Sequence, residues 1–250
     1  SAHYAMDGSA AAMAGDMARA MREGREGFRP LPPARWRGQE GDAALMRDLG
    51  FADGRAPEGA YIDRLSLDPM HFRMPPKDVT HLNPQQLLML DLGDRALRDA
   101  GIEPGGRVAV IVAMAIEQDI HLLGGRWSLE PRLRGLLGST AAPEVVAMVK
   151  DAVRQPPDAG DFLAYVGNLM ASRITALWDF SGPSFTISAG PCAVVQAIDL
   201  ARSFLENGEA DAVLVGAVDL SAGFENMAIR QAVSPGATGS GPGFGLDAVS

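Results

Sequence analysis

Two strand-like runs that bracket a helix, within residues 181–220, constrain the fold more than any other feature of this sequence. Residues 184–188 alternate weakly and carry β-forming side chains, and "DAVLVGAVDL" (211–220) is an almost continuous apolar run. Pro191 can open the intervening helix, and Gly208 can end it. Two buried strands joined by a helix form a parallel βαβ unit. The sequence therefore predicts an α/β fold with a mainly parallel sheet.

The segment before this unit supplies a second helix and a third strand. "NPQQLLMLDLGDRALRDAG" predicts a helix that Asn83 caps, with Pro84 in its first turn and Gly101 at its end. Gln86 can complete a capping box. "RVAVIVAM" (107–114) is typical of a strand that is covered on both faces. Further helices are expected at residues 117–123, 142–154 and 161–178.

Apolar positions recur at helical spacing in the two clearest helices, so each helix is expected to pack one face on the sheet. The earlier stripe comprises Leu87, Leu90, Leu97 and Ala100. The later stripe comprises Val194, Ala197, Ile198, Ala201 and Leu205. Residues 43–82 and the tail after residue 233 lack such a pattern and are expected to be mostly loop.

The composition excludes several classes of function. The net charge is −9, whereas nucleic acids and anionic membranes bind basic surfaces. A single cysteine cannot form an intramolecular disulfide, which favours a reducing, cytoplasmic compartment. No apolar run is long enough to span a membrane, and the four histidines lack the spacing of a metal site. We therefore expect a cytoplasmic protein with no metal, no membrane span and no nucleic-acid partner.

The turn at Gly190-Pro191-Cys192 carries that cysteine. A helix N-terminus presents unpaired N–H groups and the positive end of the helix dipole, which favour a thiolate and an oxyanion. A strand that enters a helix through a tight turn is also a natural mount for a nucleophile. Cys192 is thus a candidate acyl-accepting thiol. The simpler interpretation is a small buried residue near a disused site.

Several motifs, in the correct order, resemble the N-terminal half of β-ketoacyl synthases, the condensing enzymes of the thiolase fold. "PPKDVTHLNPQQLLMLDLGDRALRDAGI" is similar to the family's P-P-x-E-A-x-x-M-D-P-Q-Q-R-x-x-L-E-x-x-W-E-A-L-E-D-A-G-I, and "PLPPARW" to its P-x-x-R-W. "NLMASRITALWDFSGPS" resembles the segment ahead of the family's nucleophile strand. "GEADAVLVGAV" resembles the strand that follows the nucleophile helix. The resemblance covers nearly the whole chain.

The resemblance implies a layered α-β-α, thiolase-like fold. The family's first strand and its C-terminal half, which supplies two catalytic histidines, have no counterpart here. Residues 1–250 are therefore expected to be an N-terminal half-domain that is truncated at both ends. In this family acyl groups arrive on the phosphopantetheine arm of an acyl carrier protein, without another cofactor. The strand ahead of the nucleophile pairs across a homodimer or pseudo-dimer; here it comprises Ser184, Phe185, Thr186 and Ile187.

The nucleophile turn departs from the family pattern. Aligned without a gap, Ser188, Ala189 and Gly190 take the places of the usual Asp, Thr and Ala, and Pro191 stands where the catalytic cysteine belongs. Cys192 comes one residue late, which on a helix is a rotation of about 100° and a rise of about 1.5 Å. Its sulfur is therefore expected to point away from the acyl tunnel, and the turn is predicted to be vestigial.

Residues 187–221 also resemble chain-length-factor-type ketosynthase-like domains of polyunsaturated fatty acid and heterocyst glycolipid synthases, whose turn lacks the cysteine. "REGFRPLPPARWRG" is similar to the start of those domains. The resemblance implies a non-condensing domain of a fatty acid or polyketide synthase. Such a domain pairs with an active ketosynthase and shapes the acyl pocket that limits chain length.

Two alternatives use the same turn differently. In the first, the chain is part of an active β-ketoacyl-ACP synthase, and Cys192 attacks the carrier-bound thioester with help from histidines of the missing half. In the second, it is part of a decarboxylating variant that primes synthesis.

Other side chains have a functional and a structural interpretation. Met114 and Met170 either line an acyl channel or, more simply, fill the core. Five arginines could attract an acidic carrier protein, although such residues more often form a solvated face. They are Arg35, Arg37, Arg126, Arg132 and Arg134.

Overall fold

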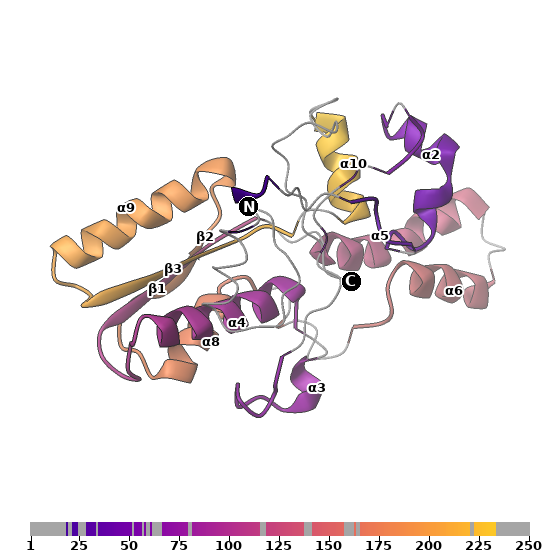
Figure 1. Ribbon diagram of the computed structural model, residues 1–250. Coiled ribbons are helices and arrows are strands. Elements are labelled where there is room, and N and C mark those ends of the chain that lie inside the picture. The colour runs from indigo at the N-terminus through magenta and orange to yellow at the C-terminus, as the bar shows by residue number, and fades with distance from the viewer. Residues whose placement is uncertain are drawn as a thin grey trace.

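Three parallel strands form a sheet in the order β2-β1-β3 (Figure 1). They are β1 (Val108–Met114), β2 (Ser184–Ile187) and β3 (Ala212–Val218). The pairing of β1 with β2 starts at Val110 and Ser184, and the pairing of β1 with β3 starts at Val108 and Ala212. The predicted strands and their parallel pairing are confirmed, except that β3 is half-buried and not fully covered as expected.

The computed structural model describes residues 19, 22–24, 29–33, 35–51, 53–56, 58, 61, 67–79, 82–115, 119–137, 142–157, 163, 166–220 and 223–233. The tail that was expected to be loop lies outside these residues.

The central strand β1 is buried on both faces. Val110 and Val112 pack into the core on one face, and Ile111 and Ala113 into the core on the other. Each buried Val or Ile contributes about 1.5–3 kcal/mol through removal of its apolar surface from water. This alternation fixes the register of the sheet, since a shift by one residue would exchange the two faces.

Helices cover both faces of the sheet (Figure 1). α4 (Pro84–Asp99) and α8 (Leu169–Trp178) pack together on one face, and α9 (Ala193–Glu206) packs on the other. Leu90 and Leu97 of α4 are buried as expected. Leu87 is only half-buried and Ala100 is exposed.

The ends of α4 follow the sequence prediction in all but one respect. Asn83 Oδ1 accepts a hydrogen bond from the N–H of Gln85 at 2.8 Å, and Pro84 occupies the first turn. Gly101 has φ +66, the left-handed conformation that glycine adopts without strain. The predicted capping box is wrong, because Gln86 Oε1 has no hydrogen-bond partner and its Nε2 binds other carbonyls.

The N-terminal region forms a second, smaller core with the end of the described chain. It contains the 3₁₀ turn η1 (Gln39–Gly41) and α2 (Ala43–Asp48), and it packs against α10 (Phe224–Val233). The expectation of loop over residues 43–82 is therefore wrong at α2 and at α3 (Pro76–Val79). Gln231 Nε2 donates to the carbonyl of Gly50 at 2.9 Å and joins segments that are 181 residues apart. Side chains buried in this core are Trp36, Met46, Phe51, Tyr61 and Met227.

α5 (Asp119–Leu137) and α6 (Pro143–Val153) form a helical hairpin. α5 is longer than the expected helix at residues 117–123 and contains Pro131 in its interior. Arg126 binds Asp151 at 2.6 Å and Glu130 binds Lys150 at 2.9 Å, so two ion pairs join the helices. In the described part of the chain, no helix has the length and apolar character needed to cross a membrane.

Candidate functional site

The turn from Ser188 to Cys192 lies at the carboxyl edge of the sheet. β1, β2 and β3 run parallel, and Ala113 pairs with both Ile187 and Ala217 near their ends. The carboxyl ends of parallel strands are where α/β proteins commonly place their sites. The turn that the sequence singles out is therefore well placed for a substrate.

The backbone of this turn runs directly into α9, and the N–H of Ala193 donates to the carbonyl of Gly190. Gly190 has φ +56, and Gly190–Cys192 forms the 3₁₀ turn η2. Cys192 occupies the N-cap of α9, and its side chain makes no capping hydrogen bond. The amides of the first helical turn are thus not capped by that side chain.

Cys192 is exposed, so the simpler expectation of a buried residue is wrong for this chain. α9 buries a stripe of small side chains on the sheet, namely Ala193, Ala197 and Ala201. Cys192 precedes Ala193 by one residue and therefore faces away from that stripe.

The large aliphatic residues of α9 lie on its exposed side, whereas Phe204 packs on the core beneath the helix. Val194, Ile198 and Leu205 were expected to pack on the sheet, and that expectation is wrong, since Ile198 is 57% exposed. Val195 is exposed as well, at 68%. The sheet accepts the alanines, and the larger side chains form an apolar surface that is called the α9 face below. The α9 face begins next to Cys192.

Gln86 fixes the loop that crosses this edge of the sheet. Its Nε2 donates to the carbonyls of Leu163 at 3.1 Å and Val166 at 3.3 Å. A Cβ atom at Gly167 would come within 2.7 Å of Met114 Sδ, so the loop also packs tightly on the end of β1. Met114 and Met170 thus both pack in the core that α4 and α8 share with the sheet.

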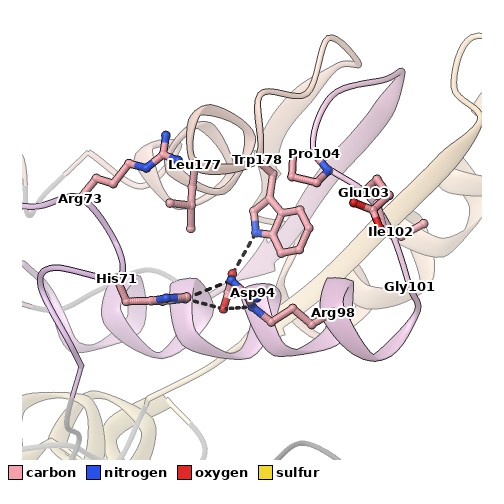
Figure 2. Close-up of a pocket in the computed structure, with 10 residues that line it drawn as sticks. All are labelled: His71, Arg73, Asp94, Arg98, Gly101, Ile102, Glu103, Pro104, Leu177 and Trp178. Carbon is pink, nitrogen blue, oxygen red and sulfur yellow. Dashed lines mark hydrogen bonds and ion pairs between the residues drawn. The ribbon is translucent and has the colours of Figure 1, made fainter.

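A second polar site, which we call the Asp94 pocket, lies near the amino ends of the strands (Figure 2). It has a volume of about 620 Å³. Asp94 lies at its centre and accepts hydrogen bonds from Trp178 Nε1 at 3.0 Å and Arg98 Nε at 2.9 Å. His71 Nε2 lies 2.8 Å from Asp94 Oδ2. The lining residues are His71, Arg73, Asp94, Arg98, Gly101, Ile102, Glu103, Pro104, Leu177 and Trp178.

The environment of Asp94 favours the ionised carboxylate. Burial by itself raises the pKa of Asp94, but the hydrogen bonds from Arg98 and His71 outweigh burial and lower it below the usual aspartate value. The Arg98 guanidinium also lies 5.5 Å from the ring centre of Trp178, within the range of a cation–π contact. Asp94 is thus a buried anion whose charge is balanced locally.

Sequence reasoning missed this pocket. The signal was Asp94 itself, which lies on the buried face of α4 between Leu90 and Leu97. The ketosynthase motif quoted above has Trp at the position of Asp94 and Glu at that of Arg98. A charged residue in place of a large aromatic, on a face otherwise apolar, is a pattern that predicts a buried ion pair.

Most of the arginines considered for carrier binding already have partners. Arg126 binds Asp151, and Arg134 binds Glu130 at 3.0 Å. Arg37 lies 3.6 Å from Glu225, and Arg35 stacks on the Tyr61 ring. Among the described residues, no group of three or more His, Cys, Asp or Glu side chains could hold a metal ion.

Comparison with known proteins places these features in a family. The model of the beta-ketoacyl synthase N-terminal domain matches residues 6–242. A polyunsaturated fatty acid synthase subunit of Thraustochytrium sp. is 34% identical over 239 residues, which cover 93% of this chain and 11% of that protein. A highly reducing polyketide synthase of Didymella fabae is 28% identical over 191 residues, 72% of this chain and 9% of that protein.

Solved structures of related proteins agree with this family assignment. The structure named PfaC keto synthase–chain length factor has a TM-score of 0.76 at 35% identity and covers 87% of this chain and 24% of its own. The ishigamide ketosynthase/chain length factor has a TM-score of 0.56 at 18% identity, covers 90% of this chain and 52% of its own, and supports the fold alone. The predicted thiolase-like α/β fold is confirmed. The chain spans about a tenth of the fatty acid synthase relative and about a quarter of the PfaC structure.

Proposed function

Because the chain belongs to the beta-ketoacyl synthase family, as its N-terminal domain, we propose that it is a non-condensing, chain-length-factor-like part of a fatty acid or polyketide synthase. It pairs with an active ketosynthase and shapes the acyl pocket by packing, without forming a thioester. Acyl groups reach the pair on the phosphopantetheine arm of an acyl carrier protein, in the cytoplasm.

One observation carries this proposal: a proline occupies the position where the family has its nucleophile. Residues 188–191 read Ser-Ala-Gly-Pro and offer no thiol. Proline also has no N–H, so Pro191 cannot donate to an oxyanion. Cys192 is the N-cap of α9, one residue beyond the aligned position.

Two surfaces support a role in pairing. β2 is an edge strand of the described sheet and binds β1 on one side only. The α9 face exposes large apolar side chains on the helix that covers one face of the sheet. Apolar surface of this kind is typical of interfaces that other chains or domains cover. Two structural relatives carry both ketosynthase and chain length factor in their names.

The test offers a labelled acyl-acyl carrier protein to the complete ketosynthase-like domain that contains this chain, together with its condensing partner. Mass spectrometry then locates the acyl group. We expect the label on the partner's cysteine, none at Cys192, and unchanged product formation by the Cys192→Ala variant. Gln196→Ala, an exposed substitution on the same helix but outside the α9 face, is the matched control.

A second candidate function is favoured by the exposure of Cys192. An accessible thiol at a helix start has the surroundings of a reactive cysteine. If Cys192 becomes acylated stoichiometrically, and Cys192→Ala abolishes both label and activity, the chain is part of an active ketosynthase. Release of CO2 from a malonyl group on the carrier protein, without chain elongation, would identify the decarboxylating variant.

A further inference from the structure

The Asp94 pocket has no role in the proposed function, yet it has the dimensions of a ligand site. Its volume of about 620 Å³ falls within the range of small-molecule pockets. It lies between the end of α4, the end of α8 and the Gly101–Pro104 connection, all near the amino ends of the strands. The turn with Cys192 lies at the opposite edge of the sheet.

At the floor of the pocket, the charge of Asp94 is balanced by Arg98. The carboxylate of Asp94 is only 6% exposed and is already engaged by Trp178, Arg98 and His71. The side chain of Arg98 is 59% exposed, and its Nε alone binds Asp94. Arg98 Nη2 lies 3.5 Å from His71 Nε2, so among the described residues Nη1 is the nitrogen of this guanidinium that has no hydrogen-bond partner.

Arg73 adds a second cation at the rim. Figure 2 shows its guanidinium beside Leu177, turned away from Asp94. Within the described residues, Arg73 has neither an ion pair nor a hydrogen bond with an acidic side chain. Its backbone has φ +51, a left-handed conformation that is unfavourable for a non-glycine residue. Backbone conformations of this kind cluster at active sites and ligand-binding sites.

The remaining walls of the pocket are largely apolar. Leu177 lies beside Arg73, and Ile102 and Pro104 lie beyond Trp178 (Figure 2). Glu103 is the only acidic side chain of the lining besides Asp94, and it is exposed on the same side as Ile102. A second negative charge on a ligand would meet Glu103, whereas an aliphatic body would meet apolar walls.

We propose that the Asp94 pocket binds a monocarboxylate with a short aliphatic body. The carboxylate pairs with the Arg73 guanidinium in charge-assisted hydrogen bonds. The aliphatic body lies against Leu177, Ile102 and Pro104. Asp94 is not a direct ligand; it is a positioning residue that holds Arg98 and Trp178.

The experiment titrates the full 250-residue chain with hexanoate and follows the indole N–H resonances by NMR. The chain has three tryptophans, and Trp178 alone lines the pocket. Trp178→Phe assigns its resonance. Trp36 and Trp127 serve as internal controls, since they lie in the second core and on α5.

We expect hexanoate to shift the Trp178 resonance in a saturable manner and to leave the other two unchanged. Hexanamide, which lacks the charge, and inorganic phosphate, which lacks the aliphatic body, should bind at least about tenfold more weakly. Arg73→Gln should weaken hexanoate binding about tenfold. Arg132→Gln, on the exposed side of α5, is the matched control and should have no effect.

Three results would overturn the proposal. One is a Trp178 resonance that hexanoate does not move while the three resonances remain dispersed as in a folded chain. Another is equal binding of hexanoate by the Arg73→Gln and Arg132→Gln variants. The third is phosphate binding as tight as hexanoate binding, since a plain anion site would explain it.

Discussion

The indole N–H of Trp178 donates a hydrogen bond to Asp94 Oδ1 at 3.0 Å and thereby joins the last residue of α8 to the middle of α4. Both side chains are buried. A buried carboxylate that lost its partners would bear the full cost of desolvation, so this bond also fixes how the two helices pack. The Asp94 pocket depends on that arrangement.

Asp94→Asn should destabilise the chain by about 1.5–3 kcal/mol, because the substitution removes the charge that Arg98 and His71 bind. Asp91→Asn is the matched control on the same helix. Asp91 pairs with Arg95 at a more exposed position, and its loss should cost about 0.5 kcal/mol or less. Urea unfolding measures both variants. If both variants lost the same unfolding free energy, the Asp94–Arg98 pair would contribute no more than an ordinary surface ion pair.

The contribution of Asp94 should disappear in acid. The pKa of Asp94 is lower in the folded chain than in the unfolded chain. In an unfolded chain the pKa of an aspartate is about 3.9. The unfolded state therefore takes up a proton first as the pH falls, and unfolding is favoured. The stability that Asp94 provides is complete above pH ~4 and is lost as the pH falls through its folded-state pKa. The difference in unfolding free energy between the unmodified chain and Asp94→Asn should shrink accordingly between pH 7 and pH 3; a constant difference would contradict this.

Gly182→Ala should destabilise the chain by at least about 2 kcal/mol. A Cβ atom at this position would overlap the carbonyl of Val108 and come within 2.7 Å of the Ala109 nitrogen, and backbone atoms of a central strand cannot move aside. Gly124→Ala is the control, because nothing lies within 4 Å of a Cβ atom there. Within α5 the control should be neutral or stabilising by up to about 1 kcal/mol. Thermal unfolding compares the two variants.

Ile198→Gln distinguishes a surface that is covered by a partner from one that faces water. In the 250-residue chain this substitution should change stability by less than about 0.5 kcal/mol, because Ile198 is exposed. In the complete ketosynthase-like domain with its partner, it should lower stability by more than about 1 kcal/mol. Ala197→Gln, one residue earlier and fully buried, should destabilise both. Equal, negligible effects of Ile198→Gln in both settings would mean that the α9 face stays in water.

The sequence pattern predicted the elements that make up the sheet. Continuous apolar runs identified β1 and β3, and the cap at Asn83 and the left-handed Gly101 placed α4. These signals are local, since a cap or a buried strand leaves its mark on neighbouring residues. The same signals do not say how large a side chain the sheet accepts. For that reason the predicted stripe of α9 is right at Ala197 and Ala201 and wrong at its larger residues.

The candidate sites differ in the same way: one follows from local sequence signals and the other depends on tertiary packing. The turn at residues 188–192 was found because a strand, a turn and a helix follow one another in the chain. The Asp94 pocket joins His71, Asp94 and Trp178, which are up to 107 residues apart, through contacts that no short motif encodes. The single hint was a charge in an apolar stripe. Ion pairs between distant segments become visible only once the helices are packed.

The short outer strand β2 has a practical consequence for work with this chain. Within the described part of the chain its outer edge has no partner strand, and the α9 face leaves valine and isoleucine side chains uncovered. Edges of this kind recruit further strands and promote aggregation. Preparations of the isolated polypeptide should therefore lose solubility as their concentration rises, and a charged substitution on the outside of the edge should keep them monodisperse.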